Sequence, residues 1–120
     1  MSFNYFQKSG IMSSPLGSSW VGYSGHGEGF NNPDMEAVKG VGPLPRGKYT
    51  IGQPYDDPHL GPCVMHLDPM PGTNTFGRSL FRIHGDNAEL NHSASDGCII
   101  LGPAARRVIS TSADRELVVQ

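Results

Sequence analysis

Polar and apolar residues alternate most regularly in residues 79–84. Alternation with a period of two predicts a β-strand with one buried face, because successive side chains of a strand point to opposite sides. Phe81 and Ile83 therefore share one face of the predicted strand, and Leu80 and Arg82 share the other. His84 is the last residue of this predicted strand.

Four other segments predict strands, each of them short and bounded by glycine, proline or a polar residue. They are residues 48–51, 63–67, 98–101 and 116–119. Residues 103–110 predict the one clear helix, since Pro103 suits the first turn of a helix. Asp34 is expected to cap a helix of about one turn that ends before Gly40.

Glycine and proline separate these segments, because the 120-residue chain contains 16 Gly and 10 Pro in no repeating pattern. Such spacing is typical of β-rich domains with many loops. The predicted fold class is mainly β, a sandwich or barrel with one or two short helices, in a single domain over residues 1–120. Trp20, Tyr23 and Phe30 are the expected anchors of short strands near the start of the chain.

The charge and the longest apolar run exclude several classes of protein. The formal net charge is −2, which predicts no binding to nucleic acid or to an anionic membrane. Residues 98–101 form the longest uninterrupted apolar run, which is far too short to span a bilayer. Residues 1–14 lack the apolar stretch of a secretory signal, so we expect synthesis in the cytoplasm without a signal peptide.

The segment that carries candidate chemistry runs from His84 to Cys98, and each of these two residues stands beside a glycine, Gly85 or Gly97. A thiol and an imidazole can form a nucleophile–base pair, since the thiolate attacks a carbonyl and the histidine takes up and returns the proton. The N–H groups of Asp96, Gly97 and Cys98 are candidates for an oxyanion hole. The alternative is structural, with Cys98 and His84 as ordinary core residues.

Other polar residues of the same segment are weaker candidates. Ser95 could hydrogen-bond to His84 or to the turn backbone, and Asp86 could orient an imidazole or cap the loop. Gly85 lets the backbone approach a substrate closely. His92 is a candidate substrate contact, and the alternative is a plain loop histidine.

A cation for a substrate carboxylate could come from Arg82, Arg106 or Arg107, and the alternative for each is a surface arginine. Cys63 is expected to pack in a strand. We expect no disulfide between Cys63 and Cys98, because a nucleophile held in a disulfide cannot react.

Two blocks of sequence resemble the YkuD-type L,D-transpeptidases. One block is His84-Gly85 followed by Ser95-Asp96-Gly97-Cys98-Ile99, and the other is Gly42-Pro43-Leu44-Pro45-Arg46-Gly47-Lys48-Tyr49-Thr50-Ile51. The resemblance implies that Cys98 is the catalytic nucleophile and His84 its proton-transfer partner. It also implies a β fold of the L,D-transpeptidase type.

Further motifs bring the resemblance closer to the L,D-transpeptidase effectors of type VI secretion. They are Tyr23-Ser24-Gly25, Asn31-Asn32-Pro33, His84-Gly85-Asp86 and Ser95-Asp96-Gly97-Cys98-Ile99-Ile100. Members of that family are small antibacterial toxins that act on peptidoglycan in a rival's periplasm. The resemblance therefore implies a peptidoglycan stem peptide as substrate, no cofactor or metal, a cognate immunity protein, a secretion-system partner and delivery to the periplasm of a target bacterium.

Two positions depart from the general transpeptidase pattern. Asp96 stands where that pattern has histidine, and Ile100 stands where it has an arginine expected to help hold the substrate. We therefore expect trimming of tetrapeptide stems and exchange of D-amino acids to exceed the formation of new cross-links.

Two alternatives to a cysteine enzyme belong to other classes. One is a zinc-dependent peptidoglycan hydrolase that draws ligands from His66, His84, Asp86 and His92, although no metal-binding motif with fixed spacing supports it. The other is a non-catalytic module that binds the cell wall. Loss of activity on thiol alkylation, with no effect of a chelator, would favour the cysteine enzyme.

Overall fold

The computed structural model describes residues 1–88 and 94–120, which form one sheet of ten strands. The strands are β1 (Phe3–Phe6), β2 (Ile11–Ser13), β3 (Ser19–Val21), β4 (Tyr23–Ser24), β5 (Gly47–Ile51), β6 (Tyr55–Asp57), β7 (Gly61–Pro69), β8 (Arg82–His84), β9 (Ile99–Ile100) and β10 (Glu116–Val119). Their order in the sheet is β3-β2-β1-β10-β5-β7-β8-β9-β4, and β6 pairs with β7 beside this path.

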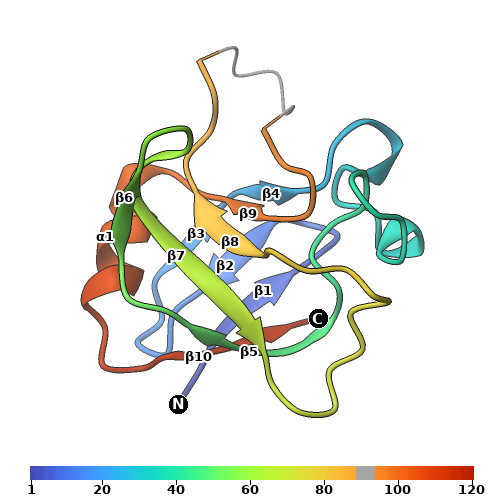
Figure 1. Cartoon of the computed structure of the whole chain (residues 1–120). Helices are drawn as coiled ribbons and strands as arrows, with labels where there is room; N and C mark the ends of the chain where they lie inside the picture. Colours follow the sequence, from blue (N-terminus) through green and yellow to red (C-terminus); the bar gives the residue numbers. More distant parts are fainter. Residues whose placement is uncertain (89–93) are drawn as a thin grey trace.

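The sheet curls into a nearly closed barrel, with the helix α1 (Pro103–Thr111) packed on one side (Figure 1). The two ends of the strand order, β3 and β4, are separated in the chain by Gly22 alone. A Cβ atom at Gly22 would collide with the carbonyl oxygen of Ile100 in β9. Glycine therefore allows the chain to pass from one end of the sheet to the other. The mainly β fold predicted from the sequence is confirmed.

The interior of the barrel is apolar and draws on strands from the whole chain. Fully buried side chains include Tyr5, Tyr49, Met65, Ile83 and Leu117. Each fully buried aliphatic side chain contributes about 1.5–3 kcal/mol relative to exposure. β1 pairs with β10 in parallel, and β8 pairs with β9 in parallel, whereas the other pairings are antiparallel.

The strand predicted at residues 79–84 is shorter in the structure, where β8 covers Arg82–His84. Leu80 has a φ angle of 63°, a left-handed conformation outside the extended region of a regular strand. The predicted faces are nevertheless correct, because Phe81 and Ile83 are buried and Leu80 is exposed. His84 ends the strand as expected.

The helices agree with the sequence in place but not in every detail. α1 begins at Pro103, as predicted, and buries Ala105 and Ile109 against the barrel. The short turn predicted near Asp34 is a 3₁₀ helix over Pro33–Met35, labelled η2. Its capping residue is Asn32 rather than Asp34, since the Asn32 side chain accepts a hydrogen bond from the Asp34 N–H group. The expectation for Asp34 as the cap was therefore wrong.

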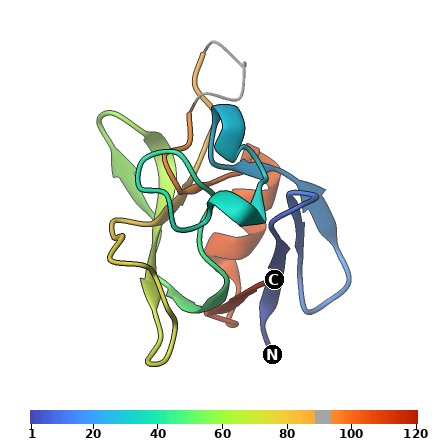
Figure 2. The ribbon, with the colours of Figure 1, turned by 90° about the vertical axis from the view of Figure 1, so that its right-hand side faces the viewer.

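A second 3₁₀ helix, η1 (Gly27–Gly29), precedes η2, and both lie on the near side of the barrel in Figure 2. Trp20 and Tyr23 lie in β3 and β4, as expected, whereas Phe30 follows η1 and packs its ring 5.3 Å from that of Tyr23. In residues 1–88 and 94–120, no helix has both the length and the apolar character needed to cross a membrane.

Candidate active site

The parallel pair β8–β9 brings His84 and Cys98 to the same region of the barrel. Ile83 pairs with Ile99 and His84 pairs with Ile100. Continuing this register by one residue places Cys98 opposite Arg82. Arg82 and His84 lie on one face of β8, because side chains of a strand alternate between faces. Cys98 and His84 are therefore diagonal neighbours on the same face of the sheet.

A cavity of about 380 Å³ opens beside this pair. It is lined by Lys39, Gly40, Leu60, Arg78, Ser79, Leu80, Phe81, Arg82, His84, Ala94, Asp96, Gly97 and Cys98. Of the residues predicted to form a site, the cavity brings together Cys98, His84, Arg82, Asp96 and Gly97. A thiol, an imidazole and a guanidinium thus line one open cavity.

The His84 ring is fixed by its own turn. Its Nδ1 atom lies 2.8 Å from the carbonyl oxygen of Gly85. A carbonyl only accepts hydrogen bonds, so Nδ1 carries the proton and Nε2 keeps a lone pair. Burial lowers the pKa of His84, with smaller contributions from the positive charges of Arg82 and Arg106. The imidazole is therefore neutral near pH 7 and able to accept a proton.

Cys98 is buried, and its sulfur interacts with Arg82 of β8 and with Leu80, which precedes β8. Burial raises the pKa of the Cys98 thiol, while hydrogen bonds from the Arg82 backbone and guanidinium work in the opposite direction. The thiol also lies 3.8 Å from the carbonyl oxygen of Leu80. With a raised thiol pKa and a lowered imidazole pKa, the resting pair is neutral, and the thiol must lose its proton as it reacts.

Arg82 is the cation next to the sulfur. Burial acts to lower its pKa, but hydrogen bonds to Cys98 and Tyr55 and their charges leave the net pKa raised. Its Nε atom is buried and makes no hydrogen bond within residues 1–88 and 94–120. Arg107 lies exposed on α1, and neither Arg106 nor Arg107 lines the cavity. Of the three arginines considered as carboxylate partners, Arg82 alone faces Cys98.

Two buried hydroxyl groups hold the turn that precedes Cys98. Ser95 Oγ donates to the carbonyl oxygen of Cys98 at 2.6 Å and accepts from the N–H groups of Gly25 and Gly97 at 2.8 and 3.2 Å. Ser24 Oγ donates to the same Cys98 carbonyl at 2.8 Å. Ser95 therefore contacts the turn backbone rather than His84, and it fixes the backbone position of Cys98.

Substitution of Ser95 by alanine is expected to lower the free energy of unfolding by about 1–3 kcal/mol, since buried N–H groups lose their acceptor. Urea denaturation followed by circular dichroism measures the change. Ser110→Ala is the matched control, because the Ser110 hydroxyl donates only to the exposed Arg107 carbonyl. Equal losses for the two variants would contradict the role assigned to Ser95.

The predicted oxyanion residues are not equivalent in the structure. The Gly97 N–H group already donates to Ser95, so the N–H groups of Asp96 and Cys98 are the two that remain outside this network. The Asp96 carboxylate lies 3.4 Å from Nδ1 of His26, which also contacts the Ser95 carbonyl at 2.8 Å. Asp96 thus contacts His26, which the sequence did not indicate as part of the site.

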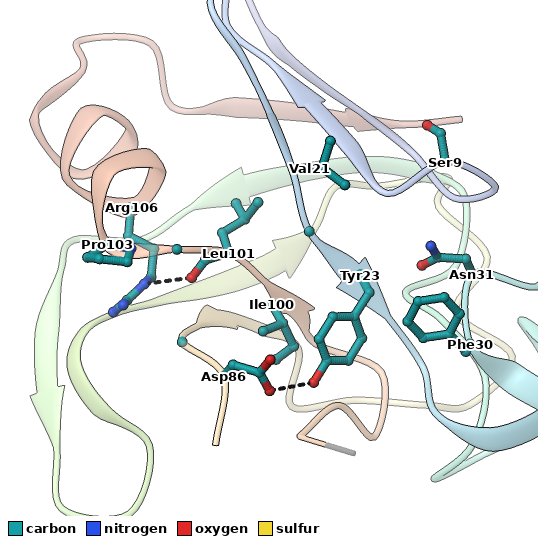
Figure 3. A pocket seen from close by; sticks show the side chains of 13 residues that line it. Ser9, Val21, Tyr23, Phe30, Asn31, Asp86, Ile100, Leu101, Pro103 and Arg106 are labelled. Carbon is teal, nitrogen blue, oxygen red and sulfur yellow. Dashed lines mark hydrogen bonds between the residues drawn. The ribbon is translucent and has the colours of Figure 1, made fainter. Parts of the chain in front are cut away.

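Gly85 and Asp86 lie outside this cavity and line a neighbouring pocket of about 740 Å³ (Figure 3). Asp86 accepts a hydrogen bond from the Tyr23 hydroxyl at 2.7 Å, and that hydroxyl accepts one from the Ala94 N–H at 3.1 Å. Burial and the Asp86 hydrogen bond raise the pKa of Tyr23 to about 12. The Tyr23 hydroxyl therefore joins Asp86 to Ala94, and the Gly85 carbonyl orients the His84 ring.

Several other expectations concern cysteines and metal ligands. Cys63 and Cys98 are free thiols, as predicted, and Cys63 packs at the edge of the core. Within residues 1–88 and 94–120, no three His, Cys, Asp or Glu side chains gather in a way that could hold a metal ion. His92, a candidate both for substrate contact and for zinc, lies outside the described residues.

Comparison with known proteins adds a match over most of the chain. The family model called the Tlde1 domain matches residues 18–117, a range that includes both His84 and Cys98. The chain belongs to the Tlde1 domain family. None of the curated proteins matches it.

The Tlde1 domain family consists of type VI secretion effectors that target peptidoglycan through L,D-transpeptidase activity. The effector resemblance found in the sequence is therefore confirmed at the level of the family. The Tlde1 match begins just before β3 and ends in β10, so that β1 and β2 lie outside the matched range. The cavity with His84 and Cys98 lies within the Tlde1 domain.

Proposed function

We propose that Cys98 and His84 form the catalytic pair of an L,D-carboxypeptidase and L,D-transpeptidase that acts on tetrapeptide stems of peptidoglycan. The observation that carries the proposal is the cavity in which a buried thiol and a neutral imidazole face the same space. Nucleophile and base on one side of a sheet are the arrangement that acyl transfer through a thioester needs.

In the proposed reaction, Nε2 of His84 takes the proton of the Cys98 thiol as the sulfur attacks the carbonyl carbon at the L-centre of the third stem residue. The bond from this carbon to the nitrogen of the terminal D-alanine breaks, and His84 returns the proton to that nitrogen. The products of this step are free D-alanine and an acyl-thioester on Cys98. Loss of the thiol proton and attack are coupled, because the resting thiol is neutral.

The acyl-thioester can then pass to one of three acceptors. Water gives a tripeptide stem, a free D-amino acid gives an exchanged tetrapeptide, and the amine of a second stem gives a cross-link. Each path breaks the same carbon–sulfur bond and returns the proton to Cys98. All three products therefore depend on one intermediate.

The charges around the cavity suit an acidic peptide. Lys39, Arg78 and Arg82 are cationic residues of its lining, and Asp96 is its carboxylate. The Nη groups of Arg78 already donate to backbone carbonyls, whereas Arg82 lines the cavity and interacts directly with Cys98. We therefore assign recognition of a stem-peptide carboxylate to Arg82.

The experiment that tests the function is mass spectrometry of purified tetrapeptide muropeptides after incubation with the protein. We expect tripeptides and, when a D-amino acid is added, exchanged tetrapeptides, with both more abundant than new cross-linked dimers. Ile100 in place of an arginine is the basis for this preference. A mixture dominated by dimers would contradict the preference, and unchanged tetrapeptides would contradict the function.

Iodoacetamide and a chelator distinguish the cysteine mechanism from a zinc hydrolase. We expect alkylation of Cys98 to stop turnover and EDTA to have no effect. Inhibition by EDTA that added Zn²⁺ reverses would instead favour the zinc hydrolase.

The cellular setting follows from the family and is likewise proposed. We infer that the protein is made in the cytoplasm and delivered by a type VI secretion component to the periplasm of a target bacterium. A cognate immunity protein would protect the producing cell. Expression of the chain with an added periplasmic signal, compared with cytoplasmic expression, tests this, since toxicity is expected only in the periplasm.

A further inference from the structure

Arg78 is a buried arginine whose hydrogen-bond partners are backbone carbonyl groups. It lies between β7 and β8, and only 6% of its surface is exposed. Nη1 donates to the carbonyl oxygens of Glu36 and Pro43 at 2.5 and 2.8 Å, and Nη2 donates to those of Gly42 and Asp96 at 2.9 and 3.3 Å. The guanidinium thus joins the segment 36–43 to the turn before Cys98.

The charge of Arg78 is not neutralised by a salt bridge to any carboxylate in residues 1–88 and 94–120. A buried charge is costly unless it is paired, and a neutral donor would satisfy carbonyl groups at lower cost. Arg78 also lines the cavity that contains Cys98, and its guanidinium lies 5.7 Å from the ring centre of Phe81. Its positive charge therefore lies at the cavity, where the charge of Glu36 reaches it without forming a salt bridge.

The peptide between Asp96 and Gly97 is held at both ends. Arg78 binds its carbonyl oxygen, and the Ser95 hydroxyl binds its N–H group. Gly97 has a φ angle of 130°, and a Cβ atom there would collide with Nη2 of Arg78. The absence of a side chain at Gly97 thus lets the guanidinium pack against the backbone that leads directly into Cys98.

We propose that Arg78 is a positioning residue for Cys98, which fixes the Asp96–Gly97 peptide and sets an unneutralised positive charge beside the sulfur. The proposal rests on the proposed role of Cys98 as nucleophile. It assigns two separable effects to one side chain. The fork of N–H groups sets the geometry of the turn, and the charge favours the thiolate.

The surroundings of the sulfur agree with the second effect. Burial lowers the pKa of Arg78, and the charges of Tyr49, Cys98 and Glu36 act in the opposite direction. Arg82 favours the Cys98 thiolate and Asp96 disfavours it, while Lys39 and His84 also line the cavity. Burial opposes ionisation of Cys98, and removal of Arg78 would take away one of the cations that counteract this effect.

The test compares Arg78→Met, Arg78→Lys and Arg107→Met. Arg107 is the matched control because it is exposed on α1 and does not line the cavity. The alkylation rate of each thiol by iodoacetamide is measured from pH 6 to pH 11 by peptide mass spectrometry. Cys63 in the same sample reports any general change. Turnover of tetrapeptide muropeptides is measured in parallel.

For Arg78→Met we expect the alkylation profile of Cys98 to move up by about one pH unit, which is a tenfold loss of thiolate at a fixed pH. The profile of Cys63 stays unchanged. Arg78→Lys keeps the charge, so its alkylation profile returns toward that of the wild type. Its kcat stays at least about tenfold low, because an ammonium has three donors and no planar fork.

A folded Arg78→Met variant with the wild-type alkylation profile and turnover would overturn the proposal. Should that variant fail to fold, Arg78→Lys decides the matter, since wild-type kcat with lysine would show that the fork does not position the turn. If the wild-type protein leaves tetrapeptides intact while Arg78→Met shows the expected alkylation shift, the proposed function is excluded and the electrostatic effect of Arg78 on Cys98 stands.

Discussion

Substitution of Cys98 by alanine is expected to abolish tripeptide formation and D-amino acid exchange together. Both products pass through the same acyl-thioester, which cannot form without the sulfur. Loss of a nucleophile lowers kcat by at least about a thousandfold in enzymes that use one. Mass spectrometry of tetrapeptide muropeptides, with and without an added D-amino acid, measures both reactions in one experiment.

Cys63→Ala is the matched control for this experiment. Cys63 is the other cysteine of the chain, and its thiol contacts the carbonyl oxygen of Arg106 rather than the cavity. We expect it to keep both activities, with at most a small loss of stability. Tripeptide formation by Cys98→Ala at the wild-type rate would exclude the thioester mechanism.

Substitution of His84 by alanine is expected to lower kcat by about 10²–10⁴-fold, the usual contribution of a positioned acid and base. One imidazole performs both proton transfers, so hydrolysis and exchange fall by similar factors. Asp96→Ala is the matched control, because its carboxylate is exposed and contacts His26. We expect less than about a tenfold loss there. Comparable losses for the two variants would contradict the assignment of the base.

The pH dependence of kcat/KM checks the same residue in the wild-type protein. A protonated imidazole cannot take a proton, so activity falls as the pH drops through the pKa of His84. Burial and the neighbouring Arg82 and Arg106 lower this pKa, and Asp57 opposes them, so the acid limb lies below pH 6.5. The thiol pKa is raised above its usual 9.0, so we expect no second fall between pH 6.5 and 9.0. An acid limb above pH 7 would contradict this account.

The sequence was sufficient for the parts of the fold that depend on local pattern. Alternation predicted the faces of β8, and proline placement predicted the start of α1 at Pro103. The start of β8 was predicted too early, because Leu80 adopts a left-handed conformation that the local sequence does not indicate. β1, β2 and β6 were not predicted as strands. β1 pairs with the distant β10, whereas β2 and β6 form local pairs with β1 and β7, and each strand depends on its partner more than on its own alternation.

The sequence predicted the site residues that combine a reactive side chain with a neighbouring glycine. It did not predict the residues whose role depends on buried polar contacts. His84 and Cys98 were found because each stands beside a glycine at a predicted strand end. Ser24, His26 and Arg78 were missed, since their roles consist of hydrogen bonds or an ion pair with groups far away in sequence. The only hint in the sequence was the position of Arg78, which follows Gly77 and stands four residues before Arg82 in the predicted strand.

The position of β10 between β1 and β5 has a kinetic consequence. β1 and β10 pair in parallel although Phe3 and Leu117 stand almost a whole chain apart. Contacts between such distant segments slow folding, because the chain loses the entropy of closing a long loop before the contacts form and offset that loss. We infer that neither half of the sheet forms by itself and that the barrel closes late, in one cooperative step. The pocket with Cys98 and His84 would then be assembled only when the whole chain has come together.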